Sequence, residues 1–134
     1  GRLADIAKVQ GGGIEALIPE LPSRWLLPAH ARSDALVGLM AEMTRSIGAR
    51  GQLNQQRAML ARPDSHADLA TLRIPTLVLC GEQDLVTLPA DHEAMAGRIP
   101  GAQWATIPDC GHLSTLEQPE AVNRVLAEWL ASTG

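Results

Sequence analysis

An aspartate and a histidine in two short polar loops are the residues of this sequence best suited to do chemistry. Asp84 lies in the loop GEQDLVT, and His112 lies 28 positions further on in the loop DCGHLST. An imidazole can accept a proton near neutral pH, and a carboxylate beside it fixes the ring tautomer and stabilises the imidazolium that forms. The two residues therefore suggest a general base, His112, held by an acid, Asp84. Glu82 is the competing acid, but it lies nearer to the preceding apolar run and is expected to point away.

Each of these loops follows an apolar run with the composition of a buried strand. The first run, IPTLVLCG at 74–81, is typical of a strand buried on both faces of a parallel sheet. A second, shorter strand is predicted for QWATIP at 103–108. Pro89 opens a predicted helix between them, which runs to about Arg98. Pro119 opens a final helix with an apolar stripe that is expected to face the sheet and comprises Val122, Val125, Leu126, Trp129 and Leu130.

The order of these segments places both loops at one end of a sheet. Strand, helix, strand and helix in succession predict parallel strands joined by a right-handed crossover. In such sheets the active crevice lies beyond the carboxyl ends of the strands, which is where both loops begin. Adjacent strands are ~4.8 Å apart, so the loops can bring the carboxylate within hydrogen-bond reach of the imidazole. Gly81 and Gly111 permit a tight backbone path beside the ring.

The stretch from residue 63 to residue 132 resembles the C-terminal end of an α/β-hydrolase-fold protein. In that family, a PTLVLxGxxDxxxP segment carries the acid, and a PxxGHxxxxExPxxV segment carries the histidine after the last strand. Both patterns occur here in this order, as PTLVLCGEQDLVTLP and PDCGHLSTLEQPEAV. By this resemblance, Asp84 is the acid and His112 the general base of a catalytic triad.

The family's nucleophile is missing from these residues. It is the serine of G-x-S-x-G, which precedes the acid and the histidine, and no serine of this chain is flanked by those glycines. Cys110 could pair with the base as a thiol nucleophile, but it shares the loop of His112, whose ring must face a separate elbow. We therefore expect the C-terminal part of a hydrolase, inactive alone. The start at Gly1 rather than at methionine suggests a cut boundary.

The first half of the sequence carries only helical signals, and the resemblance implies that it forms the cap, or lid, of the family. The expected fold is therefore α/β, with a helical cap at 1–65 followed by a β-α-β-α unit with parallel strands at 66–134. One helix is expected between an N-cap at Ser33 and a stop at Gly48, and another over about 51–62. The apolar side of the first helix is expected to comprise Leu36, Met40, Met43 and Ile47. Met40, Met43 and Met59 are expected in the core of the cap.

Composition and charge exclude several classes of protein. The 134 residues are 46% hydrophobic and 19% charged, which is typical of a globular chain. The net charge of −4 argues against nucleic-acid binding, and no apolar run approaches the ~20 residues of a membrane helix. Cys80 and Cys110 are expected to be free thiols, which suggests a cytoplasmic location. His92 between two acidic residues could suggest a metal site, but sequence neighbours do not share a helix face. No cofactor and no metal are implied.

The resemblance implies hydrolysis of a small, uncharged acyl substrate, most simply a carboxylic ester. The related activities of lactonases, C–C bond hydrolases, dehalogenases and cofactor-free haloperoxidases stay open. A non-catalytic binding or interaction module is the alternative, as is one subunit of a split hydrolase. Because two parallel strands leave open edges, we also expect a homo-oligomer formed by edge pairing or by exchange of helices.

Overall fold

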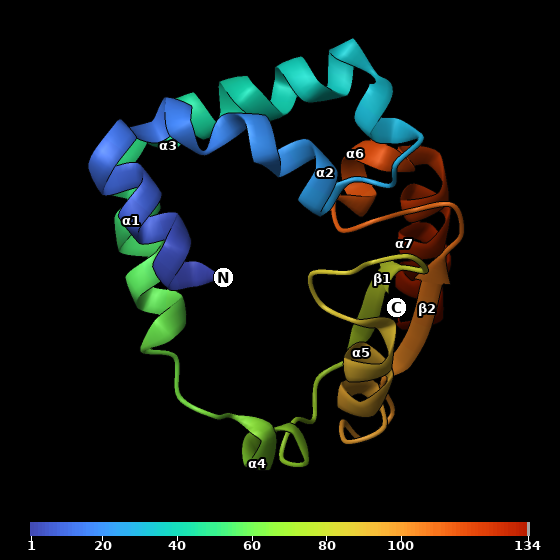
Figure 1. The fold of residues 1–134 in the computed structure, drawn as a ribbon. Helices are drawn as coiled ribbons and strands as arrows, with labels where there is room; N and C mark the ends of the chain where they lie inside the picture. The colour runs from blue at the N-terminus through green and yellow to red at the C-terminus, as the bar shows by residue number, and fades with distance from the viewer. Residues whose placement is uncertain (134) are drawn as a thin grey trace. The chain divides into compact units, whose positions relative to one another are not determined.

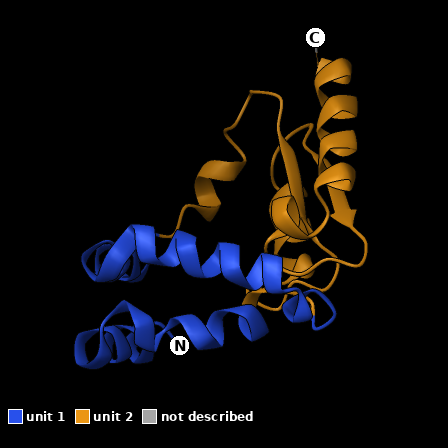
Figure 2. Cartoon of the chain, turned by 90° about the horizontal axis from the view of Figure 1, so that it is seen from above, with its two compact units in different colours: residues 1–24, 28–63 blue, residues 25–27, 64–134 orange. Residues whose placement is uncertain are grey.

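The computed structural model describes residues 1–133, which form two compact units (Figure 2). Unit 1 comprises residues 1–24 and 28–63, and unit 2 comprises residues 25–27 together with the chain from residue 64 onward. The short segment 25–27 thus belongs with residues far along the chain. That unit 1 is a lid stays a prediction.

Unit 1 is built from helices. Its longest are α1 (Arg2–Gly12) and α3 (Asp34–Leu60), which pack against each other (Figure 1). Short turns of helix lie between them, namely η1 (Ile14–Ala16), η2 (Ile18–Glu20), α2 (Leu21–Trp25) and η3 (His30–Arg32). The buried apolar side chains of this unit include Val9, Leu17, Leu21, Met40 and Ala41.

Helix α3 begins and breaks where the sequence predicts. The Ser33 hydroxyl accepts a hydrogen bond from the Leu36 amide at 3.4 Å, and Gly48 interrupts the helix with a φ of 67°. The predicted apolar side is wrong in part, because Met43 and Ile47 are 46% and 41% exposed. The inward side comprises Met40, Ala41 and Thr44, of which Thr44 can be buried because its hydroxyl donates to the Met40 carbonyl.

The methionines of unit 1 do not all enter its core, contrary to the sequence prediction. Met40 is buried, whereas Met59 is 39% exposed, as is its neighbour Leu60 at 51%. The buried positions in the second half of α3 are instead the polar residues Gln52 and Gln56. The second half of α3 therefore buries two polar side chains, and not the predicted Met59.

Unit 2 contains the predicted β-α-β-α succession, so the expected fold class is confirmed. Strand β1 (Leu77–Gly81) pairs in parallel with β2 (Gln103–Ile107), in a register that sets Gly81 opposite Ile107. Helix α5 (Pro89–Ala96) makes the crossover, and α7 (Pro119–Thr133) packs against β2 (Figure 1). The short helices α4 (His66–Leu69) and α6 (Ser114–Glu117) were not expected.

Both faces of β1 are covered, as its continuous apolar sequence predicts. Val78 packs with Ala96 and Ile99 on the side of α5. Leu79 packs on the other side with the cluster of Ile107, Cys110 and Val122. These two small cores fix the end of β1 from which the acid-bearing loop leaves.

The predicted stripe on α7 is buried only in its first part. Val122 is 3% exposed, but Leu126 and Leu130 are 38% and 60% exposed. Cys80 and Cys110 are free, as predicted, and both are buried. Within residues 1–133, no helix has both the length and the apolar character that crossing a membrane requires.

Candidate active site

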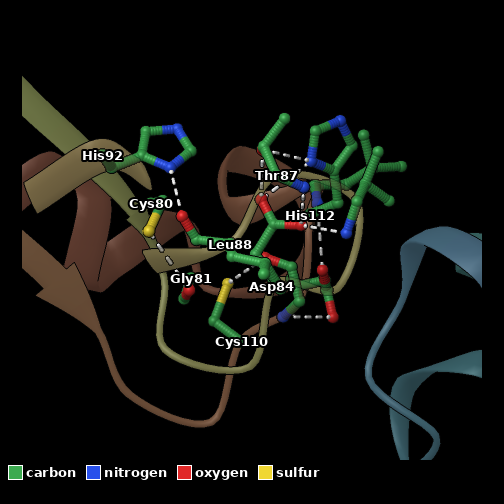
Figure 3. A network of polar contacts seen from close by, with 12 residues as sticks. Cys80, Gly81, Asp84, Thr87, Leu88, His92, Cys110 and His112 are labelled. Atoms are coloured by element: carbon green, nitrogen blue, oxygen red, sulfur yellow. Dashed lines mark hydrogen bonds and ion pairs between the residues drawn. The ribbon is translucent and has the colours of Figure 1, made fainter. Parts of the chain in front are cut away.

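Asp84 and His112 lie in contact beyond the carboxyl ends of β1 and β2. Asp84 Oδ2 is 2.9 Å from His112 Nδ1 (Figure 3). The acid is 2% exposed as a residue, whereas 31% of the histidine side chain is accessible. A buried acid therefore holds an imidazole that reaches the surface of unit 2.

The Asp84 carboxylate is surrounded by donors from its own loop. Oδ1 accepts from the amides of Val86 (2.8 Å) and Thr87 (3.1 Å), and Oδ2 accepts from the Thr87 hydroxyl at 2.9 Å. Burial alone would raise the pKa of Asp84. The hydrogen bonds from His112, Thr87 and Val86 outweigh it and hold this pKa below its ordinary value. The carboxylate is therefore ionised at neutral pH.

The contact with Asp84 fixes which nitrogen of His112 carries the proton. An ionised carboxylate only accepts hydrogen bonds, so Nδ1 must donate and the neutral ring keeps its free electron pair on Nε2. Among residues 1–133, Nε2 has no hydrogen-bond partner. The ring centroid lies 6.1 Å from that of Trp25, at a tilt of 59°. The ring is thus oriented on one side and open for proton transfer on the other.

The two loops approach each other so closely that only glycine fits at Gly81. A β-carbon there would lie 2.0 Å from the Gly111 carbonyl oxygen and 2.4 Å from that of Cys110. Backbone hydrogen bonds join the same segments, from the Glu82 amide to the Ile107 carbonyl (2.8 Å) and from the Gln83 amide to the Cys110 carbonyl (2.9 Å). The separation of the acid and the histidine is therefore set by backbone contacts.

Glu117 is a site residue that the sequence reasoning missed. It is 8% exposed and accepts hydrogen bonds from the amides of Gly111 (3.1 Å) and Leu113 (3.1 Å), the two neighbours of His112. A third bond comes from the Leu27 amide at 2.7 Å. The available signal was the glutamate in the segment GHLSTLEQP, which served only as part of the family pattern.

The residues considered as an alternative acid, a nucleophile and a metal ligand, namely Glu82, Cys110 and His92, have different surroundings. Glu82 is exposed and accepts from the Gln83 side chain. Burial raises the pKa of the Cys110 thiol to about 12, with Glu117 and Asp84 adding to the shift, so this cysteine is a neutral thiol rather than a nucleophile. The Nδ1 of His92 hydrogen-bonds the Leu88 carbonyl (Figure 3). The His92 ring also stacks on Trp104. In the described part of the chain, no three potential ligands gather to hold a metal ion.

The parallel β-α-β-α unit and the positions of its two polar loops are those of the C-terminal part of an α/β-hydrolase fold. The profile of the alpha/beta hydrolase family matches residues 2–125, and the chain belongs to this family. It is 32% identical over 125 residues to 3-oxoadipate enol-lactonase 1 of Acinetobacter baylyi, an alignment that covers 92% of the chain and 46% of the relative.

Solved structures agree with this assignment. An esterase from Thermogutta terrifontis superposes with a TM-score of 0.89 at 34% identity, over 98% of this chain and 49% of the esterase. The enol-lactonase from Burkholderia xenovorans has a TM-score of 0.87 at 22% identity, again over 49% of its length, and shares the fold. The chain spans about half the length of each of these three relatives.

Proposed function

We propose that this chain is the C-terminal part of a serine-type hydrolase that cleaves small, uncharged carboxylic esters or lactones. Asp84 is the acid of its catalytic triad and His112 is the general base. The observation that carries this proposal is the 2.9 Å contact between a buried carboxylate and a partly exposed imidazole. The similarity to an esterase and to an enol-lactonase supports acyl transfer to water as the reaction class.

The geometry of the pair supports the following roles for its two members. A serine hydroxyl attacks the carbonyl carbon while Nε2 of His112 takes its proton, and the imidazolium then returns that proton to the leaving alkoxide. Water repeats the sequence on the acyl-enzyme and releases the acid. Throughout, Asp84 keeps the proton of Nδ1 hydrogen-bonded and stabilises the positive ring.

The serine and the oxyanion-hole amides are supplied, in this proposal, by a segment outside the 134 residues. No serine of the chain lies in a G-x-S-x-G motif. Since one oxyanion donor alone contributes ~3–4 kcal/mol to lowering the barrier, a chain without the serine and these donors is expected to be inactive. We expect no turnover of p-nitrophenyl acetate above background. Turnover that His112→Ala abolishes would refute this expectation.

The coding sequence upstream of Gly1 separates this proposal from its alternatives. An in-frame G-x-S-x-G after a strand pattern supports one continuous hydrolase, whereas the same motif in a separate gene supports a split enzyme. A start codon directly before Gly1 supports a non-catalytic module. The substrate class belongs to this proposal as well. We also propose a homo-oligomer formed through the sheet edges. The two free thiols support a cytoplasmic location.

A further inference from the structure

The buried carboxylate of Glu117 accepts hydrogen bonds from the backbone before and after His112. The amide of Gly111 donates to Glu117 Oε2 at 3.1 Å, and the amide of Leu113 donates to Glu117 Oε1 at 3.1 Å. The His112 amide between them donates to the Trp25 carbonyl at 2.8 Å. Three consecutive amides of the histidine loop are therefore tied to groups outside the loop backbone.

The same carboxylate binds a segment from much earlier in the sequence. The Leu27 amide donates to Glu117 Oε2 at 2.7 Å across 90 positions of sequence. The segment 25–27 thus contacts the loop through the Trp25 carbonyl, which accepts from the His112 amide, and through the Leu27 amide, which donates to Glu117. Leu26 between them is 5% exposed, which seats this segment in the interior.

The fit of these groups leaves little room for other arrangements. A β-carbon on Gly111 would lie 2.8 Å from the Leu27 nitrogen, 3.0 Å from Glu117 Oε1 and 3.0 Å from the Trp25 carbonyl oxygen. Hydrogen bonds to a charged acceptor are about twice as strong as neutral ones. The path of the loop is therefore set by the Glu117 carboxylate and the segment 25–27 together.

We propose that Glu117 is a positioning residue, which locks the His112 loop and the segment 25–27 together so that the imidazole points at Asp84. Its consequence for catalysis rests on the proposed function, whereas its consequence for the ring does not. Without the carboxylate, the amides of Gly111 and Leu113 lose their acceptor and the loop can rotate. Nδ1 of His112 then leaves Asp84 Oδ2, and the ring loses its fixed tautomer.

Glu117→Gln is the sharpest variant, because glutamine keeps the shape of the side chain but its NH₂ group cannot accept a hydrogen bond. Glu120→Gln is its matched control, since it removes the same charge from an exposed glutamate three residues away. Two readouts are made on the 134-residue chain. One is amide hydrogen exchange at Leu27, Gly111 and Leu113, and the other is the ¹⁵N signature of the two His112 ring nitrogens.

In the wild type and in Glu120→Gln, we expect protected amides at these three positions and a ring protonated on Nδ1. In Glu117→Gln, the one remaining side-chain oxygen can accept only on one side, so exchange is expected to rise ~10-fold or more at the amides that face the NH₂ group, which are Leu113 alone or Gly111 and Leu27 together. The ring signature is expected to become that of mixed tautomers. Unchanged exchange and an unchanged ring in Glu117→Gln would overturn the proposal.

A general loss of stability in Glu117→Gln is distinguished by the amide of Val78 in β1. Opening that exceeds the opening at Val78, at whichever of these amides lose their acceptor, supports the proposal, and equal exchange throughout contradicts it. Neither readout requires hydrolysis. A chain that passes both tests but never yields an active hydrolase would refute the proposed function and leave the positioning role standing.

Discussion

Replacing Gly81 by alanine perturbs the closest approach between the two loops of the site. The new β-carbon would lie 2.0 Å from the Gly111 carbonyl oxygen and 2.7 Å from the Cys110 carbonyl carbon. These are backbone atoms, which cannot rotate away as a flexible side chain can. The end of β1 or the loop of His112 must therefore move.

The expected cost follows from two contributions. Inserting a methyl group into a packed site costs ~1–3 kcal/mol even where side chains can adjust. The movement also strains the hydrogen bonds from the Glu82 and Gln83 amides, each worth ~0.5–1.5 kcal/mol. Gly81→Ala is therefore expected to lower the free energy of unfolding of unit 2 by about 4 kcal/mol.

Urea unfolding followed by circular dichroism measures this loss, with Gly97→Ala as the control. At Gly97 the nearest atom to a new β-carbon is the Glu93 carbonyl oxygen at 3.5 Å, an ordinary contact, and φ is −63°. This variant is expected to be more stable than the wild type by ~0.4–1 kcal/mol. If the free energies of unfolding of Gly81→Ala and Gly97→Ala differ by less than about 1 kcal/mol, the two loops are not held by close backbone contact.

Three further perturbations test other parts of the molecule. The bidentate hydrogen bond from Arg24 lowers the pKa of Asp5, so this ion pair stabilises unit 1 above the ordinary pKa of 3.8, and the stabilisation is lost as the pH falls below that value. Urea unfolding at about pH 7 and pH 3 should therefore show a smaller loss of stability between the two pH values in Asp5→Asn than in the wild type. Thr87→Val removes a donor to Asp84 and is expected to cost ~1–2 kcal/mol in the same assay, most of which Thr87→Ser should restore. Cys110 is expected to react with iodoacetamide only in urea, and labelling of the folded chain at about pH 8 would contradict its raised pKa.

The contact between Asp84 and His112 could be predicted because local patterns determine it. A continuous apolar run before each loop predicts two strands, and one helix between them predicts that the strands are parallel. The loops must then leave the sheet at the same end. The glycines that allow the close approach, Gly81 and Gly111, were also visible in the sequence.

The role of Glu117 could not be predicted in this way. Its contacts depend on the segment 25–27, whose position follows from the packing of the whole unit rather than from periodicity. The exposure of Met43 and Ile47 has a similar origin. A spacing of three or four residues shows which side chains share one side of a helix, but which side faces inward depends on the neighbouring elements.

The most direct test of the central claim is ester hydrolysis by this chain when it is joined to the segment that supplies the serine. Asp84→Asn is expected to lower kcat by ~10⁴-fold and His112→Ala by ~10⁶-fold, with circular dichroism confirming that both variants fold. Glu82→Gln, which alters the exposed carboxylate of the same loop, should keep the wild-type rate. Wild-type turnover in Asp84→Asn or in His112→Ala would show that this pair is not the acid and base of the enzyme.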